Sequence, residues 1–199
     1  MSATSTAQTT PRARELPRPV RAKTFFIWVG LCLLAFPIAG EVAHAIVGPV
    51  DGVMPALIGG ALTGAGIGFA QWLLLRRTSA VGSEWIAATA AGLAVGLALG
   101  ASVVGYETTT SQLAIMGAIS GAFVGIAQGI FLRGTFSHWY VWVIAMPVLW
   151  TLGWLVTEAA GIHVEEQFIA FGLSGTLLFA IGSGLLLMAG LRRDQTPSS

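Results

Sequence analysis

The chain has 199 residues, of which 55% are hydrophobic and 10% are charged, with a net charge of +1. Soluble domains carry about 25% charged residues, so this composition excludes an ordinary water-soluble domain and predicts a protein embedded in lipid. The single cysteine, Cys32, excludes an intrachain disulfide and a thiolate metal cluster. It lies in an apolar run, where we expect a buried structural thiol.

The first 23 residues are polar and contain five basic side chains, a composition typical of disordered segments. The apolar run that follows is too long for the core of a cleaved signal peptide. We therefore predict a disordered basic tail over 1–23, a transmembrane domain over 24–193 and a second short tail over 194–199.

Six apolar stretches are long enough to cross a hydrocarbon core of roughly 30 Å, which takes about 20 helical residues. The predicted fold class is all-α, a membrane protein with six transmembrane helices joined by short connections. The expected spans are Phe25–Val47, Val53–Leu75, Trp85–Gly105, Leu113–Leu132, Trp139–Ala160 and Phe168–Leu191.

The charges are divided between the two sides of this arrangement. With six spans, ten basic and three acidic residues fall on one side and six acidic residues on the other. The positive-inside rule then places both termini in the cytoplasm. The basic residues are Arg12, Arg14, Arg18, Arg21, Lys23, Arg76, Arg77, Arg133, Arg192 and Arg193.

A repeat with an offset of 57 residues links the first two hairpins. Gly60–Arg76 (GALTGAGIGFAQWLLLR) and Gly117–Arg133 (GAISGAFVGIAQGIFLR) are identical at nine of seventeen positions. Trp28, Trp85 and Trp142 have the same spacing, and each opens a span at the cytoplasmic interface, where indoles are favoured.

We therefore expect three parallel two-helix hairpins, over about 24–80, 81–137 and 138–193, around a pseudo-threefold axis. The third hairpin has diverged, because no glutamine in it matches Gln71 and Gln128.

Three of the spans carry glycine at every fourth position, which places the glycines on one helix face. Close backbone approach along such a face drives helix association in lipid, so we expect these spans to pack tightly. The alternative, that the glycines line a narrow pore or a cofactor groove, is less common. The glycines are Gly60, Gly64, Gly68, Gly92, Gly96, Gly100, Gly117, Gly121, Gly125 and Gly129.

Ionisable residues deep in a membrane are functional by default, and the sequence places none near the middle of a span, which argues against a proton pump. Near the outer boundary, one helix face carries a carboxylate and an imidazole. With acidic and histidine residues of the last outer loop, they suggest a vestibule that attracts cations or binds a divalent metal. We favour the alternative of solvated groups that reinforce topology, and predict no metal. The residues are Glu41, His44, Glu158, His163, Glu165 and Glu166.

Gln71 and Gln128 occupy equivalent positions in the cytoplasmic third of their spans, five residues before an arginine. A buried amide needs partners, which can be the other glutamine, a backbone carbonyl or a polar solute; we favour bonding between helices. Trp150 and Trp154 form an aromatic stripe that we expect to pack or to face lipid. The sequence has no catalytic, phosphate-binding or haem motif, so we predict neither an enzyme nor a cofactor, and no nucleic-acid partner.

The repeated pattern Gly-x-x-x-Gly-x-Ala-Gln-x-x-x-Leu-Arg, at Gly64–Arg76 and Gly121–Arg133, resembles one in small, uncharacterised multi-pass bacterial membrane proteins. The resemblance covers roughly residues 25 to 133. It implies a bacterial inner-membrane location and carries no activity.

Two classes of function stay open. One is a non-catalytic structural or accessory membrane protein, with a membrane protein partner or a homo-oligomer as its setting. The other is a passive channel or small-solute transporter with an acidic outer vestibule. The environment of Gln71 and Gln128 separates them, because a channel needs these amides to face a continuous cavity.

Overall fold

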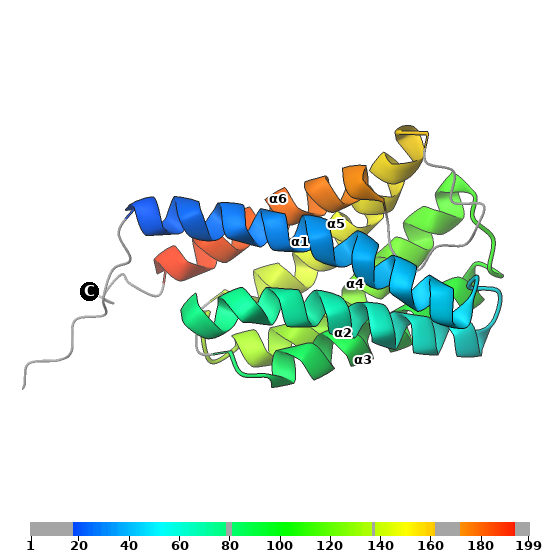
Figure 1. Cartoon of the computed structure of the whole chain (residues 1–199), viewed down its shortest axis with the longest axis horizontal. Helices are drawn as coiled ribbons and strands as arrows, with labels where there is room; N and C mark the ends of the chain where they lie inside the picture. Colours follow the sequence, from blue (N-terminus) through cyan, green and yellow to red (C-terminus); the bar gives the residue numbers. More distant parts are fainter. Residues whose placement is uncertain (1–17, 79–80, 137, 162–171, 194–199) are drawn as a thin grey trace, which may run out of the picture.

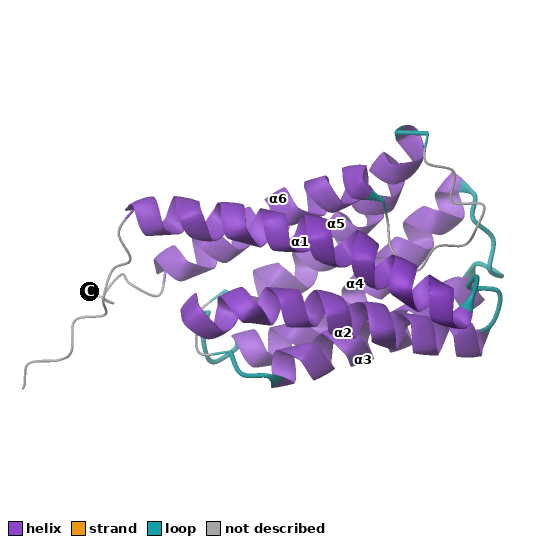
Figure 2. Cartoon of the chain, viewed as in Figure 1, coloured by secondary structure: helices purple, strands orange, loops and turns teal. Residues whose placement is uncertain are grey.

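The computed structural model describes residues 18–78, 81–136, 138–161 and 172–193. This part of the chain is helical and holds no strand (Figures 1 and 2). All six helices are long and apolar enough to span a membrane, which confirms the predicted fold class. They are α1 (Arg18–Val47), α2 (Val53–Thr78), α3 (Glu84–Val103), α4 (Thr110–Leu132), α5 (Trp139–Ala159) and α6 (Leu173–Arg193).

Helix α1 is longer than predicted, because it begins at Arg18 instead of Phe25. It therefore includes part of the basic segment that we expected to be a disordered tail. Pro19 lies in its first turn, where the missing N–H costs no helical hydrogen bond, so proline does not prevent this early start. Residues 1–17 and 194–199, and the predicted start of the last span at Phe168, lie outside the described residues.

The helices form a closed ring. Each helix packs against the helices before and after it in the chain, and α1 closes the ring on α6. Arg18 at the start of α1, the end of α6 and the connections α2–α3 and α4–α5 all lie at one end of the bundle (Figure 1). We call this the basic end, because Lys23, Arg76 and Arg133 lie there. We call the opposite end the acidic end.

Helices α1, α3 and α5 leave the basic end, and a glycine with positive φ follows each of them. These are Gly48 (φ 75°), Gly105 (φ 63°) and Gly161 (φ 74°). Glycine adopts this left-handed conformation without steric cost and so commonly follows the last turn of a helix. Each glycine N–H bonds a carbonyl of the turn before it, from Gly48 to His44, from Gly105 to Ser102 and from Gly161 to Glu158.

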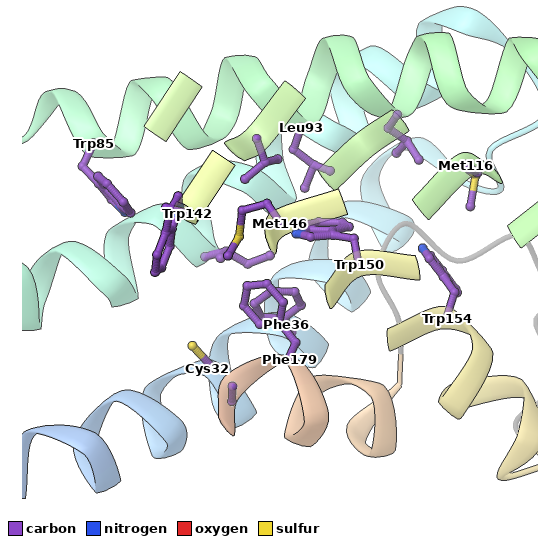
Figure 3. Packing of buried hydrophobic residues seen from close by; sticks show 14 of the residues in the cluster. Cys32, Phe36, Trp85, Leu93, Met116, Trp142, Met146, Trp150, Trp154 and Phe179 are labelled. Atoms are coloured by element: carbon purple, nitrogen blue, oxygen red, sulfur yellow. The ribbon is translucent and has the colours of Figure 1, made fainter. Parts of the chain in front are cut away.

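The same three helices supply a regular series of buried positions. Positions 57 residues apart are buried in successive layers, and Figure 3 shows side chains of these layers following one another along the bundle. From the basic end, the layers are Trp28, Trp85 and Trp142; Cys32, Thr89 and Met146; Phe36, Leu93 and Trp150; and Gly40, Leu97 and Trp154.

The glycines at every fourth position lie where neighbouring helices touch. A Cβ atom added to Gly64 of α2 would lie 2.6 Å from the carbonyl oxygen of Thr89 on α3. One added to Gly96 of α3 would lie 2.8 Å from Cα of Ser120 on α4, and one on Gly121 of α4 2.6 Å from the Met146 carbonyl oxygen on α5. These obstacles are backbone atoms or lie next to the backbone, so a side chain can be accommodated only if the helices separate.

We predict that Gly64→Leu and Gly121→Leu prevent assembly of the bundle, and that Gly64→Ala and Gly121→Ala each cost about 1–3 kcal/mol of stability through overpacking. Thermal unfolding of the detergent-purified protein, followed by size-exclusion chromatography, measures this loss. Gly30→Ala is the matched control, because no atom lies within 4 Å of a Cβ added there. Equal melting temperatures for Gly30→Ala and Gly64→Ala would contradict the proposed packing role.

Candidate functional site

The three repeated tryptophans meet at one level of the ring. Trp28, Trp85 and Trp142 are at most 3% exposed. The ring of Trp142 lies 6.2 Å from that of Trp28 and 6.2 Å from that of Trp85, each pair in an edge-to-face arrangement. This geometry is favourable for aromatic pairs. It leaves three indole N–H groups inside the protein, and each needs an acceptor.

Two of these acceptors are the repeated glutamines. The Trp85 indole donates to Oε1 of Gln71 (3.1 Å) and the Trp142 indole to Oε1 of Gln128 (3.0 Å). The Gln128 amide donates to Oε1 of Gln71 (3.2 Å) and to Oγ1 of Thr89 (3.0 Å). Both glutamines are 1% exposed. All of these bonds join different helices, which is the bonding that we favoured from the sequence.

The third indole finds a different acceptor. Trp28 donates to Oγ of Ser183 on α6 (3.0 Å), and this hydroxyl donates in turn to the carbonyl of Phe179 (2.7 Å). The position 57 residues after Gln128 is Leu185, which is 58% exposed. Helix α6 therefore presents a different position to the centre, and a serine replaces the glutamine.

Cys32 of α1 connects this helix to Gln71 of α2. Its buried thiol lies one helical turn after Trp28 and makes a side-chain hydrogen bond with Gln71. Hydrogen bonds therefore join α1 to α2, α2 to α3 and α4, α3 to α4, α4 to α5, and α1 to α6. We call this network the polar belt; it consists of Trp28, Cys32, Gln71, Trp85, Thr89, Gln128, Trp142 and Ser183. Comparison of the repeats identified the tryptophans and glutamines, but it missed Ser183 and Thr89. The sequence signal that could have found these two residues is a small hydroxyl side chain within an apolar stretch.

The aromatic stripe of α5 faces the core. Trp150 and Trp154 are 2% and 1% exposed. The Trp150 ring lies 5.9 Å from Phe36 and 6.1 Å from Phe179 (Figure 3). Packing, the first of the two roles that we expected for this stripe, is therefore the one observed.

The acidic end holds the other polar candidates, and they are spread out. Glu41 is exposed, and His44 is half-buried one turn later on α1. Glu158 of α5 accepts a hydrogen bond from Thr110 of α4. His163, Glu165 and Glu166 lie outside the described residues. Within the described part, no three histidine, cysteine or acidic residues are grouped to hold a metal ion.

Two arginines at the basic end lie against tryptophan rings. The Arg76 guanidinium lies 4.7 Å from the Trp72 ring centre, and that of Arg133 lies 4.2 Å from the Trp139 ring centre. Both distances permit a cation–π interaction. Arg76 and Arg133 are equivalent positions of the repeat. Each lies five residues after the glutamine of its helix, between the polar belt and the basic end.

No protein-family model, curated protein or solved structure matches this chain. What the polar belt can do chemically is therefore inferred from the side-chain groups that it contains. Indoles, amides and hydroxyls are neutral at physiological pH, and the belt joins them in hydrogen bonds. Such a network holds helices in register and offers no nucleophile paired with a base.

We predict that Gln128→Leu lowers stability by about 1–3 kcal/mol, because it leaves the buried Trp142 N–H without its acceptor. Interhelical hydrogen bonds in membrane proteins average about 0.6 kcal/mol and reach about 1.7 kcal/mol, so the combined loss of three bonds is measurable by chemical unfolding in detergent. The double variant Gln71→Leu/Gln128→Leu should cost less than the sum of the single variants, since they share a bond.

Gln112→Leu is the control for this series, because Gln112 bonds to Glu107 and Thr109 at the exposed acidic end. We expect a change within about 0.5 kcal/mol. Strict additivity of the two core variants would contradict a connected network.

Proposed function

We propose that this chain is a non-catalytic structural or accessory protein of a bacterial cell membrane. The polar belt is the observation that supports this most directly. It uses the repeated polar side chains of the spans to bind helices to one another, and the layers beyond it fill the centre of the ring with tryptophan, phenylalanine and leucine. A helix bundle built in this way leaves its outer face available for partners.

The passive-channel alternative needs polar groups that face a water-filled path. Gln71 and Gln128 were the candidates, and their amides bond to Trp85, Trp142 and Thr89 within the protein. The buried polar side chains of the described residues are hydroxyls and amides, with no carboxylate, guanidinium, ammonium or imidazole among them. A proton-coupled or ion-coupled transport step therefore finds no support in the interior.

We also propose that the bundle consists of three parallel hairpin repeats, α1–α2, α3–α4 and α5–α6. The offset of 57 residues relates the buried layers of α1, α3 and α5 as well as the sequence motif. In each case the tryptophan that opens a hairpin bonds the second helix of another hairpin: Trp85 bonds α2, Trp142 bonds α4 and Trp28 bonds α6. This cyclic pattern supports pseudo-threefold organisation, with α6 as the diverged member.

The basic end is proposed to face the cytoplasm, because basic residues near span ends favour that side. A membrane-impermeant maleimide added to intact cells should label Thr109→Cys at the acidic end and leave Ser83→Cys at the basic end unlabelled. Both positions are exposed, and Cys32 is buried, which keeps the background low. Labelling of Ser83→Cys alone would reverse the orientation.

The structural role is tested by gentle extraction into native-like lipid particles, followed by mass spectrometry of everything retained. We expect a stoichiometric membrane protein partner or a defined homo-oligomer. The same preparation, reconstituted into liposomes, should pass neither ions nor small neutral solutes. Solute flux that Gln71→Leu or Gln128→Leu abolishes, without loss of folded protein, would overturn the proposal in favour of the channel.

A further inference from the structure

Helix α1 exposes a continuous apolar face on the outside of the ring. Four aliphatic side chains, spaced four residues apart, are each 53–63% exposed: Leu34, Ile38, Val42 and Ile46. This spacing keeps them on one side of the helix. Helix α1 is also the least buried of the six spans, so its outer face is open to lipid or to a partner.

A carboxylate interrupts this apolar face. Glu41 is exposed, and so are Ile38 one turn before it and Ala45 one turn after it. Among the described residues, the Glu41 carboxylate takes part in no hydrogen bond or ion pair. His44 is half-buried and contacts other groups. Glu41 is therefore an acid without an ion-pair partner in the described chain, with apolar surface on both sides of it.

The length of α1 indicates that Glu41 lies below the bilayer surface. The uncharged run from Thr24 to Gly40, which follows Lys23, has 17 residues and spans about 26 Å at 1.5 Å per residue. A hydrocarbon core of roughly 30 Å takes about 20 residues, and a tilted helix needs more. Twenty residues counted from Thr24 reach Ala43, which lies beyond Glu41. The core therefore extends past the carboxylate.

A charged group at this depth needs a partner. Acidic side chains in membrane-spanning segments are costly to leave alone in hydrocarbon, and they pair with an opposite charge or a hydrogen-bond donor. A hydrogen bond from a cation to a carboxylate is among the strong polar contacts in proteins. An occupant that brings a cationic donor to the height of Glu41 therefore relieves the cost of the exposed carboxylate.

A second copy of this chain in the same orientation does not supply that donor. In the predicted topology, all ten lysine and arginine residues lie on the cytoplasmic side, whereas Glu41 lies toward the acidic end. A soluble protein does not reach a group below the bilayer surface. A transmembrane helix of another protein does, because it can pack against Leu34 and Ile38 and carry a basic side chain at this height.

We propose that the exposed face of α1 binds a transmembrane helix of another membrane protein, and that Glu41 pairs with an arginine or lysine of that helix. The aliphatic side chains supply packing, and the carboxylate supplies selectivity for a helix with a cation near its outer end. This inference rests on the proposed accessory role and specifies the chemistry of the partner.

The test uses the full-length protein in phosphatidylcholine liposomes, with a synthetic transmembrane peptide of leucine and alanine as the probe. One arginine lies four residues from each end of the peptide, so that either insertion orientation presents a cation near Glu41. Energy transfer from a fluorophore on Thr109→Cys to one on the peptide measures association. We expect binding about 5- to 30-fold tighter than that of the same peptide with leucine at both positions, the range of polar bonds between model membrane helices.

Glu41→Gln should remove this preference for the arginine peptide. Glu41→Arg should reverse it and favour a peptide with glutamate at the two positions. Both substitutions are on the exposed face, so we expect unchanged melting temperatures. Glu107→Gln is the matched control, because Glu107 lies in the α3–α4 connection and bonds Gln112; it should retain the preference.

Equal binding of the arginine and leucine peptides, or a preference that Glu41→Gln leaves intact, would overturn the proposal. Displacement of the arginine peptide by phosphatidylethanolamine, in the wild type and not in Glu41→Gln, would assign the carboxylate to a lipid ammonium group and overturn the helix partner. The proposed non-catalytic role is tested separately, since the liposome flux measurement does not depend on Glu41.

Discussion

The need to satisfy the indole N–H groups of the three repeated tryptophans in a lipid environment governs the polar belt. Hydrocarbon offers no hydrogen-bond acceptor, so each of these three indoles depends on an acceptor on another helix. Trp85 and Trp142 use glutamines and Trp28 uses a serine, each at 3.0–3.1 Å. Because every one of these bonds crosses between hairpins, satisfying the indoles also fixes which hairpins are neighbours and at what height they meet.

The glycine faces make that geometry attainable. The amide of Gln128 reaches Gln71 and Thr89 because α2, α3 and α4 approach so closely that a Cβ on Gly64 or Gly96 would collide with the next helix. Wider spacing would leave the amides unpaired in a dry interior, which is costly. Dispersion contacts along the glycine faces and hydrogen bonds in the polar belt therefore support each other, and loss of either weakens both.

Much of this was predictable from the sequence, and the exceptions have physical causes. Long apolar runs predicted the six spans, and the offset of 57 residues matched the three tryptophans with one another and Gln71 with Gln128. It did not predict that the indoles are buried and donate to the glutamine amides, because we expected these tryptophans at the membrane interface. The role of Ser183 was not predictable, because α6 turns a different position to the centre and Leu185 faces outward. The early start of α1 was missed because hydropathy detects the bilayer boundary, whereas a helix can continue beyond it into water.

The hydrogen bonding within the polar belt moves the search for function to the outer surface. Indoles, amides and hydroxyls that bond one another leave little for a solute to bind, so selective recognition has to occur where the bundle meets lipid or another protein. Helix α1 is the least buried of the six spans, and its contact with α2 is made by small residues beneath a furrow. A larger share of α1 than of any other described span therefore faces lipid or a partner.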